Sequence, residues 1–194
     1  MSNKALLESR GLTKRFGDFT AVGNVDYRVS EGESAGIIGP NGAGKSTFFN
    51  LLTGMFSPSQ GTVSFLGTDV TGRTADSRVA LGLIRTFQLV SVFNSLTVLD
   101  NLVLAAVRSS EDFKHKSSFM FGSAHRKRIL KICEKSLVEV GLERKMWALT
   151  AELSYGEKRM LEIAMALSLK PKALLLDEPL AGLSDVEIKD VLVI

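Results

Sequence analysis

Apolar and polar side chains alternate through residues 5–30, most regularly where Val25, Tyr27 and Val29 share one face. A period of two predicts half-buried strands, so this part of the chain is expected to form antiparallel sheet. Residues 62–66 alternate in the same way and are expected to return to that sheet.

Three further segments predict short strands. Residues 35–38 and 173–176 are continuous apolar runs. Such runs are typical of strands covered on both faces, as in a parallel sheet. Residues 83–88 form another predicted strand that ends on a polar side chain.

Helical spacing appears in four places. One helix is expected to start near Lys45 and continue through residues 48–52, and a second near residue 98, where Thr97 and Asp100 have capping-box spacing.

The third and fourth helices follow in the second half of the chain. Residues 126–140 place an apolar side chain on one face at nearly every turn and end before Gly141, where a C-cap glycine belongs. That face consists of Ile129, Cys133, Leu137 and Val140. The fourth helix begins after a Ser154–Glu157 capping box and ends near residue 169, before Pro171.

Composition narrows the class of protein. A chain of 194 residues with 45% hydrophobic content can bury a sizeable core. The formal charge of +3, from 24 basic and 21 acidic side chains, is too balanced to indicate a nucleic-acid partner. The single cysteine excludes an internal disulfide. No apolar run approaches the roughly 20 residues that span a bilayer, so membrane association is expected to go through a partner.

Residues 39–47 carry the most specific chemistry, because they fit the pattern Gly-x-x-x-x-Gly-Lys-[Ser/Thr] at every fixed position. Glycines let successive backbone N–H groups face one concavity, and the following helix N-terminus favours anions. Lys45 is expected to reach the β- and γ-phosphates, and the Ser46 hydroxyl to bind Mg²⁺. A glycine-rich turn that binds nothing is the competing interpretation. The predicted phosphate contacts are Gly39, Pro40, Asn41, Gly42, Ala43, Gly44, Lys45, Ser46 and Thr47.

Two carboxylates follow the last apolar run. Asp177 is expected to hold Mg²⁺ directly or through water, and Glu178 to orient and deprotonate an attacking water. Gln88 ends a predicted strand, where ligands collect in open α/β sheets. A solvated acidic turn and an ordinary turn residue are the alternatives.

Two further positions have weaker signals. Phe16 lies in a basic, glycine-ended turn expected at residues 12–17, from which its ring could stack on a base or turn into the core. Ser154 and Gly156 could offer a hydroxyl and backbone N–H groups to an anion, or serve only in the capping box.

In combination, these motifs resemble the ATP-binding-cassette ATPases of membrane transporters. The resemblance rests on the phosphate loop, Gln88, Leu-Ser-Tyr-Gly-Glu at 153–157 and Leu-Leu-Leu-Asp-Glu-Pro at 174–179, in this order. Within that family, residues 84–88 and 153–159 look most like the branched-chain amino acid importer subgroup. Relatives that serve urea or short amides look alike.

The resemblance implies an α/β fold: a phosphate-loop NTPase core with mainly parallel sheet, an N-terminal antiparallel β-subdomain and an inserted helical subdomain. Residues 1–194 would form one ATP-binding domain. Residues 1–88 and 161–194 would make the core with its β-subdomain, and residues 89–160 the helical subdomain that contacts a permease.

The resemblance also implies roles for the candidate residues. ATP would bind with Mg²⁺ between two subunits arranged head to tail. Phe16 would stack on adenine, while Ser154 and Gly156 would serve the partner's ATP. Gln88 would join Glu178 and Lys45 in catalysis, and would bind Mg²⁺.

Partners and location follow from the same resemblance. A second ATPase subunit, two transmembrane permease subunits and an external solute-binding protein are implied, with this chain peripheral on the cytoplasmic face of the membrane. An ATPase that acts on DNA or ribosomes would predict a duplicated cassette or a long coiled-coil insertion, and the sequence has neither.

The family's switch histidine would follow the Asp-Glu pair by some tens of residues, yet no histidine follows residue 125. The sequence therefore predicts a C-terminally shortened cassette that binds ATP and hydrolyses it poorly. A subunit that binds ATP without hydrolysis is the alternative.

Overall fold

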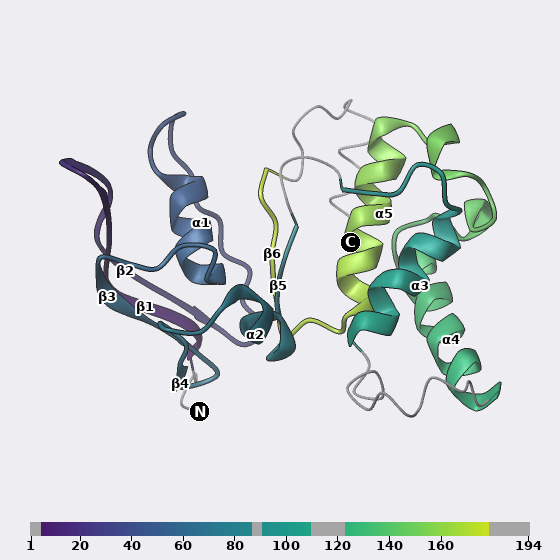
Figure 1. Cartoon of the computed structure of the whole chain (residues 1–194), viewed down its shortest axis with the longest axis horizontal. Coiled ribbons are helices and arrows are strands. Elements are labelled where there is room, and N and C mark those ends of the chain that lie inside the picture. Colours follow the sequence, from purple (N-terminus) through teal and green to yellow (C-terminus); the bar gives the residue numbers. More distant parts are fainter. Residues whose placement is uncertain (1–4, 87–90, 110–122, 179–194) are drawn as a thin grey trace. The chain divides into compact units, whose positions relative to one another are not determined.

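The computed structural model describes residues 5–86, 91–109 and 123–178 (Figure 1). They divide into two compact units, Met1–Ile84 and Arg85–Ile194. The first unit contains the elements β1 (Ala5–Phe16), β2 (Phe19–Ser30), α1 (Lys45–Thr53), β3 (Gln60–Phe65), β4 (Thr68–Asp69) and α2 (Ala75–Ala80).

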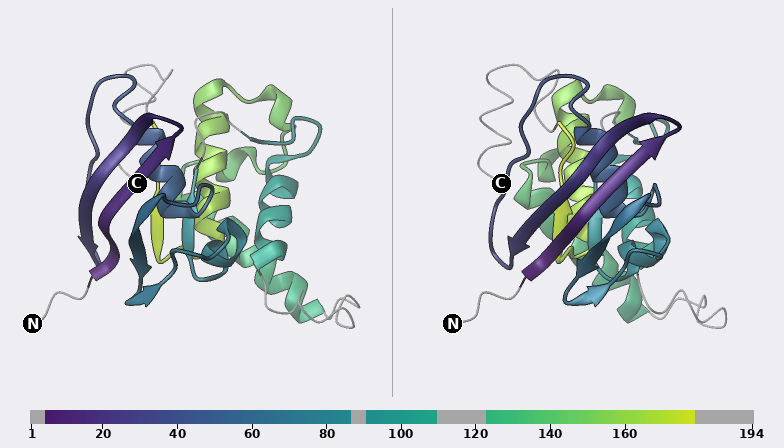
Figure 2. Two further views of the ribbon diagram at one scale, coloured as in Figure 1. Left: turned by 60° about the vertical axis from the view of Figure 1, so that its left-hand side comes forward. Right: turned by 90° about the vertical axis from the view of Figure 1, so that its left-hand side faces the viewer.

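An antiparallel sheet of order β2-β1-β3-β4 forms the frame of the first unit, as the alternation of side chains predicts. Figure 2 shows β1 and β2 as a long hairpin with α1 on one side of it. The turn predicted at residues 12–17 is wrong in length. Strand β1 continues to Phe16, which pairs with Phe19, and Gly17 takes the positive φ of 58° that this tight connection requires.

Helix α1 packs on the sheet through its apolar side. The rings of Phe48 and Tyr27 meet edge to face, with centroids 5.6 Å apart, and Leu51 and Leu52 are buried. Burial raises the pKa of the Tyr27 hydroxyl. The helix that follows the phosphate loop is therefore held against β2 at Tyr27.

A buried arginine secures the C-terminal end of α1. Arg78 of α2 is 1% exposed, and its Nη1 donates to the carbonyls of Leu51 (2.9 Å) and Leu52 (2.6 Å). Its Nη2 donates to the carbonyl of Thr71 at 3.0 Å. Burial lowers the pKa of Arg78. These bonds satisfy carbonyls that the end of a helix leaves without a helical partner.

The strand predicted at residues 35–38 is wrong. These residues are irregular, and Ile38 is 95% exposed. A strand needs a neighbour for its backbone groups. Among the described residues, β1–β4 pair with one another and β5 (Leu83–Arg85) pairs with β6 (Ala173–Leu175), so no strand is paired with this run.

Helices make up most of the described part of the second unit, and Figure 1 shows α3, α4 and α5 packed together. Their buried side chains form one hydrophobic cluster. The predicted face of α4 is confirmed, because Ile129, Cys133, Leu137 and Val140 are all buried in that cluster. The elements are α3 (Val98–Ser109), α4 (Ser123–Glu139), the 3₁₀ turns η2 (Glu143–Lys145) and η3 (Thr150–Glu152), α5 (Tyr155–Ser168) and β6.

Helix ends in this unit follow the sequence signals. The Thr97 hydroxyl accepts from the Asp100 N–H at 3.1 Å, which confirms the first capping box. Gly141, after α4, has a φ of 71°, and Leu142 N–H donates to the Leu137 carbonyl at 2.9 Å. Within the described ranges, no helix has both the length and the apolar character needed to cross a membrane.

The C-terminal end of β5 continues into the second unit beside β6. The backbone N–H of Thr86 donates to the Leu175 carbonyl at 3.0 Å, and β6 leads directly into the carboxylate pair. With the antiparallel sheet of the first unit, this short parallel sheet confirms the predicted α/β class. The subdomain boundaries at residues 89 and 160 stay a prediction.

Candidate functional site

The phosphate loop joins β2 to α1 by an exposed connection. Gly44 caps α1 in a left-handed conformation (φ 85°), and its carbonyl accepts from the Phe48 N–H at 2.8 Å. The Lys45 ammonium folds back over the loop and donates to the carbonyls of Gly39 (2.7 Å) and Pro40 (3.0 Å). The Ser46 side chain is exposed. The loop thus gathers a cation, a hydroxyl and a helix N-terminus at one place.

Close packing explains the glycine at position 44. A Cβ built there would lie 2.3 Å from the Ala21 carbonyl oxygen of β2, a separation that no side chain tolerates. Gly42 has the same backbone conformation (φ 84°), yet a Cβ there would meet nothing within 4 Å. The two glycines therefore serve different purposes: both permit the left-handed turn, and Gly44 also lets the loop approach the hairpin.

Gly44→Ala is expected to lower the free energy of unfolding by about 2 kcal/mol, because left-handed strain adds to a backbone clash. Gly42→Ala carries the strain alone and is expected to cost about 1 kcal/mol. Urea unfolding of both variants measures the difference. Equal losses would show that the approach to Ala21 contributes nothing.

Phe16 lies at the end of β1 in the first unit, the unit that also holds the phosphate loop. Its side chain is 47% exposed, so the core position considered from the sequence is wrong. A half-exposed ring at a hairpin end can offer an apolar surface to a planar ligand.

The helix α5 begins at the capping box that the sequence predicts. Ser154 Oγ accepts from the Glu157 N–H at 3.2 Å, and Glu157 Oε2 accepts from the Ser154 N–H at 2.9 Å. Lys145 donates to the other oxygen of the Glu157 carboxylate. Ser154 and Tyr155 are exposed at this helix start, while Gly156 is buried. Contact of Ser154 and Gly156 with a partner's ATP stays a prediction.

The carboxylate pair follows β6 in the second unit. Asp177 is 7% exposed, and its Oδ2 forms an ion pair of 2.6 Å with Nη2 of Arg85. Glu178 is exposed and has a φ of 47°, which is uncommon for a side chain of this kind. Strained backbone of this sort concentrates at functional sites.

Arg159 of α5 fixes the backbone of that pair. Its Nη2 donates to the carbonyls of Asp177 (2.7 Å) and Glu178 (3.4 Å), and its Nη1 forms a 2.6 Å ion pair with Glu162. The Arg159 side chain is 2% exposed. Through Arg159, the helix α5 therefore holds the turn that contains Asp177 and Glu178.

These residues fit a nucleotide with its metal in chemical terms. Gly44 has a left-handed backbone conformation at the start of α1, and the Lys45 ammonium already donates to a backbone oxygen of the loop, as it could to a phosphate oxygen. Mg²⁺ usually takes one or two protein oxygens together with substrate phosphates, and the Ser46 hydroxyl of the first unit and the Asp177 carboxylate of the second are each oxygen donors of this kind. Among the described residues, no group of three or more His, Cys, Asp or Glu could hold a metal by itself.

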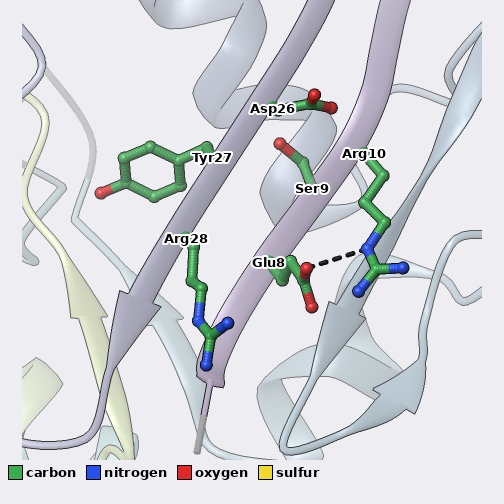
Figure 3. Close-up of a pocket in the computed structure, with 6 residues that line it drawn as sticks. All are labelled: Glu8, Ser9, Arg10, Asp26, Tyr27 and Arg28. Atoms are coloured by element: carbon green, nitrogen blue, oxygen red, sulfur yellow. Dashed lines mark hydrogen bonds and ion pairs between the residues drawn. The ribbon is translucent and has the colours of Figure 1, made fainter. Parts of the chain in front are cut away.

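A separate concavity lies on the β1–β2 sheet, and Figure 3 shows its polar lining. Those side chains bond mainly within the hairpin. Glu8 pairs with Arg10 at 2.8 Å, Ser9 Oγ donates to the Val25 carbonyl, and Asp26 accepts from a backbone N–H. Two carboxylates, Glu8 and Asp26, balance the two arginines of this concavity, so it has no excess positive charge for a phosphate. Its lining consists of Glu8, Ser9, Arg10, Asp26, Tyr27 and Arg28.

The structure divides the predicted site residues between the units. Phe16 and residues 39–47 belong to the first, and Ser154, Gly156, Asp177 and Glu178 to the second. Gln88 lies outside the described residues. Sequence reasoning missed Arg85 and Arg159 as supports of the carboxylates. For Arg85 the available signal was a charged side chain inside an otherwise apolar segment, whereas Arg159 follows Glu157 and Lys158 and gives no such signal.

Comparison with known proteins agrees with this geometry. The ABC transporter family model matches residues 22–181. A high-affinity branched-chain amino acid transport ATP-binding protein, BraF of Pseudomonas aeruginosa, is 36% identical over 97% of this chain and 75% of its own length. LivG of Escherichia coli, which carries the same description, is 35% identical over the same shares.

Solved structures show the same fold. An ATP-binding cassette of an ABC transporter in its ADP conformation has a TM-score of 0.82 at 30% identity, covering 97% of this chain and 74% of that one. A nucleotide-free ATP-binding cassette has a TM-score of 0.81 at 30% identity, with the same coverage. Together with the phosphate loop and the carboxylate turn, these similarities show that the chain belongs to the ABC transporter family, as an ATP-binding subunit related to those of branched-chain amino acid transport.

Proposed function

We propose that this chain is the ATPase subunit of an importer for branched-chain amino acids, in which ATP binding and hydrolysis drive transport through permease subunits. The main observation behind the proposal is the phosphate loop, in which the Lys45 ammonium lies against the carbonyls of Gly39 and Pro40. Relatives named for branched-chain amino acid transport support the choice of solute.

In this proposal the first unit binds the nucleotide. The Lys45 ammonium exchanges carbonyl partners for oxygens of the β- and γ-phosphates, and the backbone N–H groups of residues 39–47 hold the remaining oxygens. Phe16 stacks on the adenine ring. Ser46 and Asp177 would hold Mg²⁺, which supplies charge neutralisation of the phosphates when bound.

The second unit supplies the groups for hydrolysis. Glu178 accepts the proton of the attacking water, and Gln88 is proposed to orient that water and to bind Mg²⁺. Arg85 and Arg159 keep the turn in place through the contacts at Asp177 and Glu178.

The proposed assembly contains a second ATPase subunit, two transmembrane permease subunits and an external solute-binding protein, with this chain on the cytoplasmic face of the membrane. Ser154 and Gly156 face the partner's ATP in a head-to-tail dimer. Their place at the start of α5, with Ser154 exposed, supports this role.

Lys45→Ala is expected to weaken ATP binding about thirtyfold, because a charge-assisted contact to phosphate is worth about 2 kcal/mol. Isothermal titration with MgATP measures it. Lys135→Ala on α4, whose side chain is 78% exposed, serves as the control and should bind as the natural chain does. Unchanged affinity in Lys45→Ala would refute the phosphate-loop assignment.

A further inference from the structure

Three side chains form a compact group at the end of β1, which we call the hairpin-end cluster: Lys14, Phe16 and Phe56. The rings of Phe16 and Phe56 meet edge to face, with centroids 5.8 Å apart and an interplanar angle of 80°. The Lys14 ammonium lies over both rings, 5.2 Å from the Phe16 centroid and 5.8 Å from that of Phe56. Both geometries are attractive for aromatic rings.

Hydrogen bonds hold this cluster from two segments that are distant in sequence. Lys14 Nζ donates to the Ser57 carbonyl at 2.7 Å. The Ser59 N–H donates to the Thr13 carbonyl at 2.8 Å, and Ser59 Oγ accepts from the Arg15 N–H at 3.0 Å. The turn after α1 is therefore tied to the end of β1, and this tie determines where Phe56 stands.

The cluster also lies near the phosphate loop. Gly44 contacts Ala21 of β2, one residue from Thr20, which pairs with Arg15 beside Phe16. Helix α1 starts at the loop and ends at Thr53, shortly before Phe56. Both ends of α1 are thus anchored to the same hairpin.

Hydrogen bonds between its two segments and partial exposure of its rings distinguish the cluster from an ordinary core contact. Phe16 and Phe56 are 47% and 36% exposed, so their edge contact buries little area. A lone exposed phenylalanine must give up rotamer freedom when a ligand stacks on it. A ring that a neighbouring ring and a cation already hold in one rotamer loses less conformational entropy when a ligand stacks on it, so the ligand binds more tightly.

We propose that Phe56 and Lys14 are positioning residues that hold the Phe16 ring as a preorganised platform for the nucleotide base. Phe56 meets the ring in the edge-to-face contact, the Lys14 ammonium lies over it, and the exposed 47% of Phe16 is the surface offered to the base. This inference rests on the proposed contact of Phe16 with adenine and adds two residues that act through it.

The test separates the base from the phosphates. Binding of ATP and of inorganic tripolyphosphate is measured by isothermal titration for the natural chain, Phe56→Leu and Lys14→Met. Phe56→Leu is expected to weaken ATP binding about fivefold and Lys14→Met about threefold. Tripolyphosphate affinity should stay within twofold, which also reports an intact phosphate loop. Phe56→Tyr keeps an aromatic edge and should restore ATP affinity.

Phe93→Leu, at a phenylalanine of the second unit that is 58% exposed, is the matched control and should change neither affinity. Unchanged ATP binding in Phe56→Leu, or equal losses for both ligands, would overturn the inference. If the natural chain bound ATP no better than tripolyphosphate, the base would add nothing to binding, and the proposed contact between Phe16 and adenine would be refuted. Failure of the natural chain to bind either ligand would instead refute the proposed function.

Discussion

Glu178→Gln is expected to lower ATP hydrolysis about a thousandfold while MgATP still binds, in an assembled transporter whose ATPase subunit carries the switch histidine. Glutamine keeps the size of the side chain and cannot accept a proton from water. The exposed Glu178 side chain is on a left-handed turn whose carbonyls bond to Arg159, so the amide should occupy the same position. The loss therefore measures proton transfer.

Steady-state phosphate release and uptake of labelled leucine into vesicles, both with the permease and solute-binding protein present, measure this result. Leucine uptake should fall in parallel with hydrolysis. Glu134→Gln on α4, another exposed carboxylate, is the control and should leave both rates unchanged. Undiminished hydrolysis in Glu178→Gln would exclude Glu178 as the base, and a natural complex that transports urea but not leucine would exclude the proposed solute.

Arg159→Met is expected to reduce the free energy of unfolding by about 3–5 kcal/mol. The guanidinium is 2% exposed and pairs with Glu162, whose side chain is 8% exposed. Methionine fills a similar volume but leaves a carboxylate inside the protein without its cation. It also removes the donor from the Asp177 carbonyl.

Urea unfolding of Arg159→Met, Glu162→Leu and the double variant measures this pair. Removing both charges should recover part of the stability, because no unpaired ion stays buried. Lys135→Met breaks an exposed ion pair with Glu139 and should change stability by less than about 0.5 kcal/mol. A loss in Arg159→Met as small as that would contradict the buried-pair interpretation.

Short-range sequence patterns predicted the elements whose structure depends on residues close together in the chain. The β1–β2 hairpin, the apolar face of α4 and the Ser154–Glu157 capping box follow from spacing alone, and all three are present. The Gly44–Lys45 helix start belongs to the same class, because its geometry depends on residues adjacent in sequence.

Contacts between distant segments could not be predicted in this way. Residues 35–38 look like a strand, but pairing depends on a neighbour that a short apolar run does not specify. Arg78 and Arg159 look like surface charges, and for these and for Arg85 only the fold reveals which carbonyls or carboxylates they meet. The hairpin-end cluster was missed for the same reason, since Phe16 and Phe56 come from separate segments.

Cys133 has a practical consequence for experiments in solution. It is the chain's one cysteine, lies fully buried in the α3–α4–α5 cluster, and burial raises the pKa of its thiol to about 11. Near pH 7.5 the thiol is protonated, and thiol reagents require the thiolate. A cysteine introduced on the surface will therefore be the one that reacts with maleimide. A single fluorophore can be attached there while Cys133 is left in place.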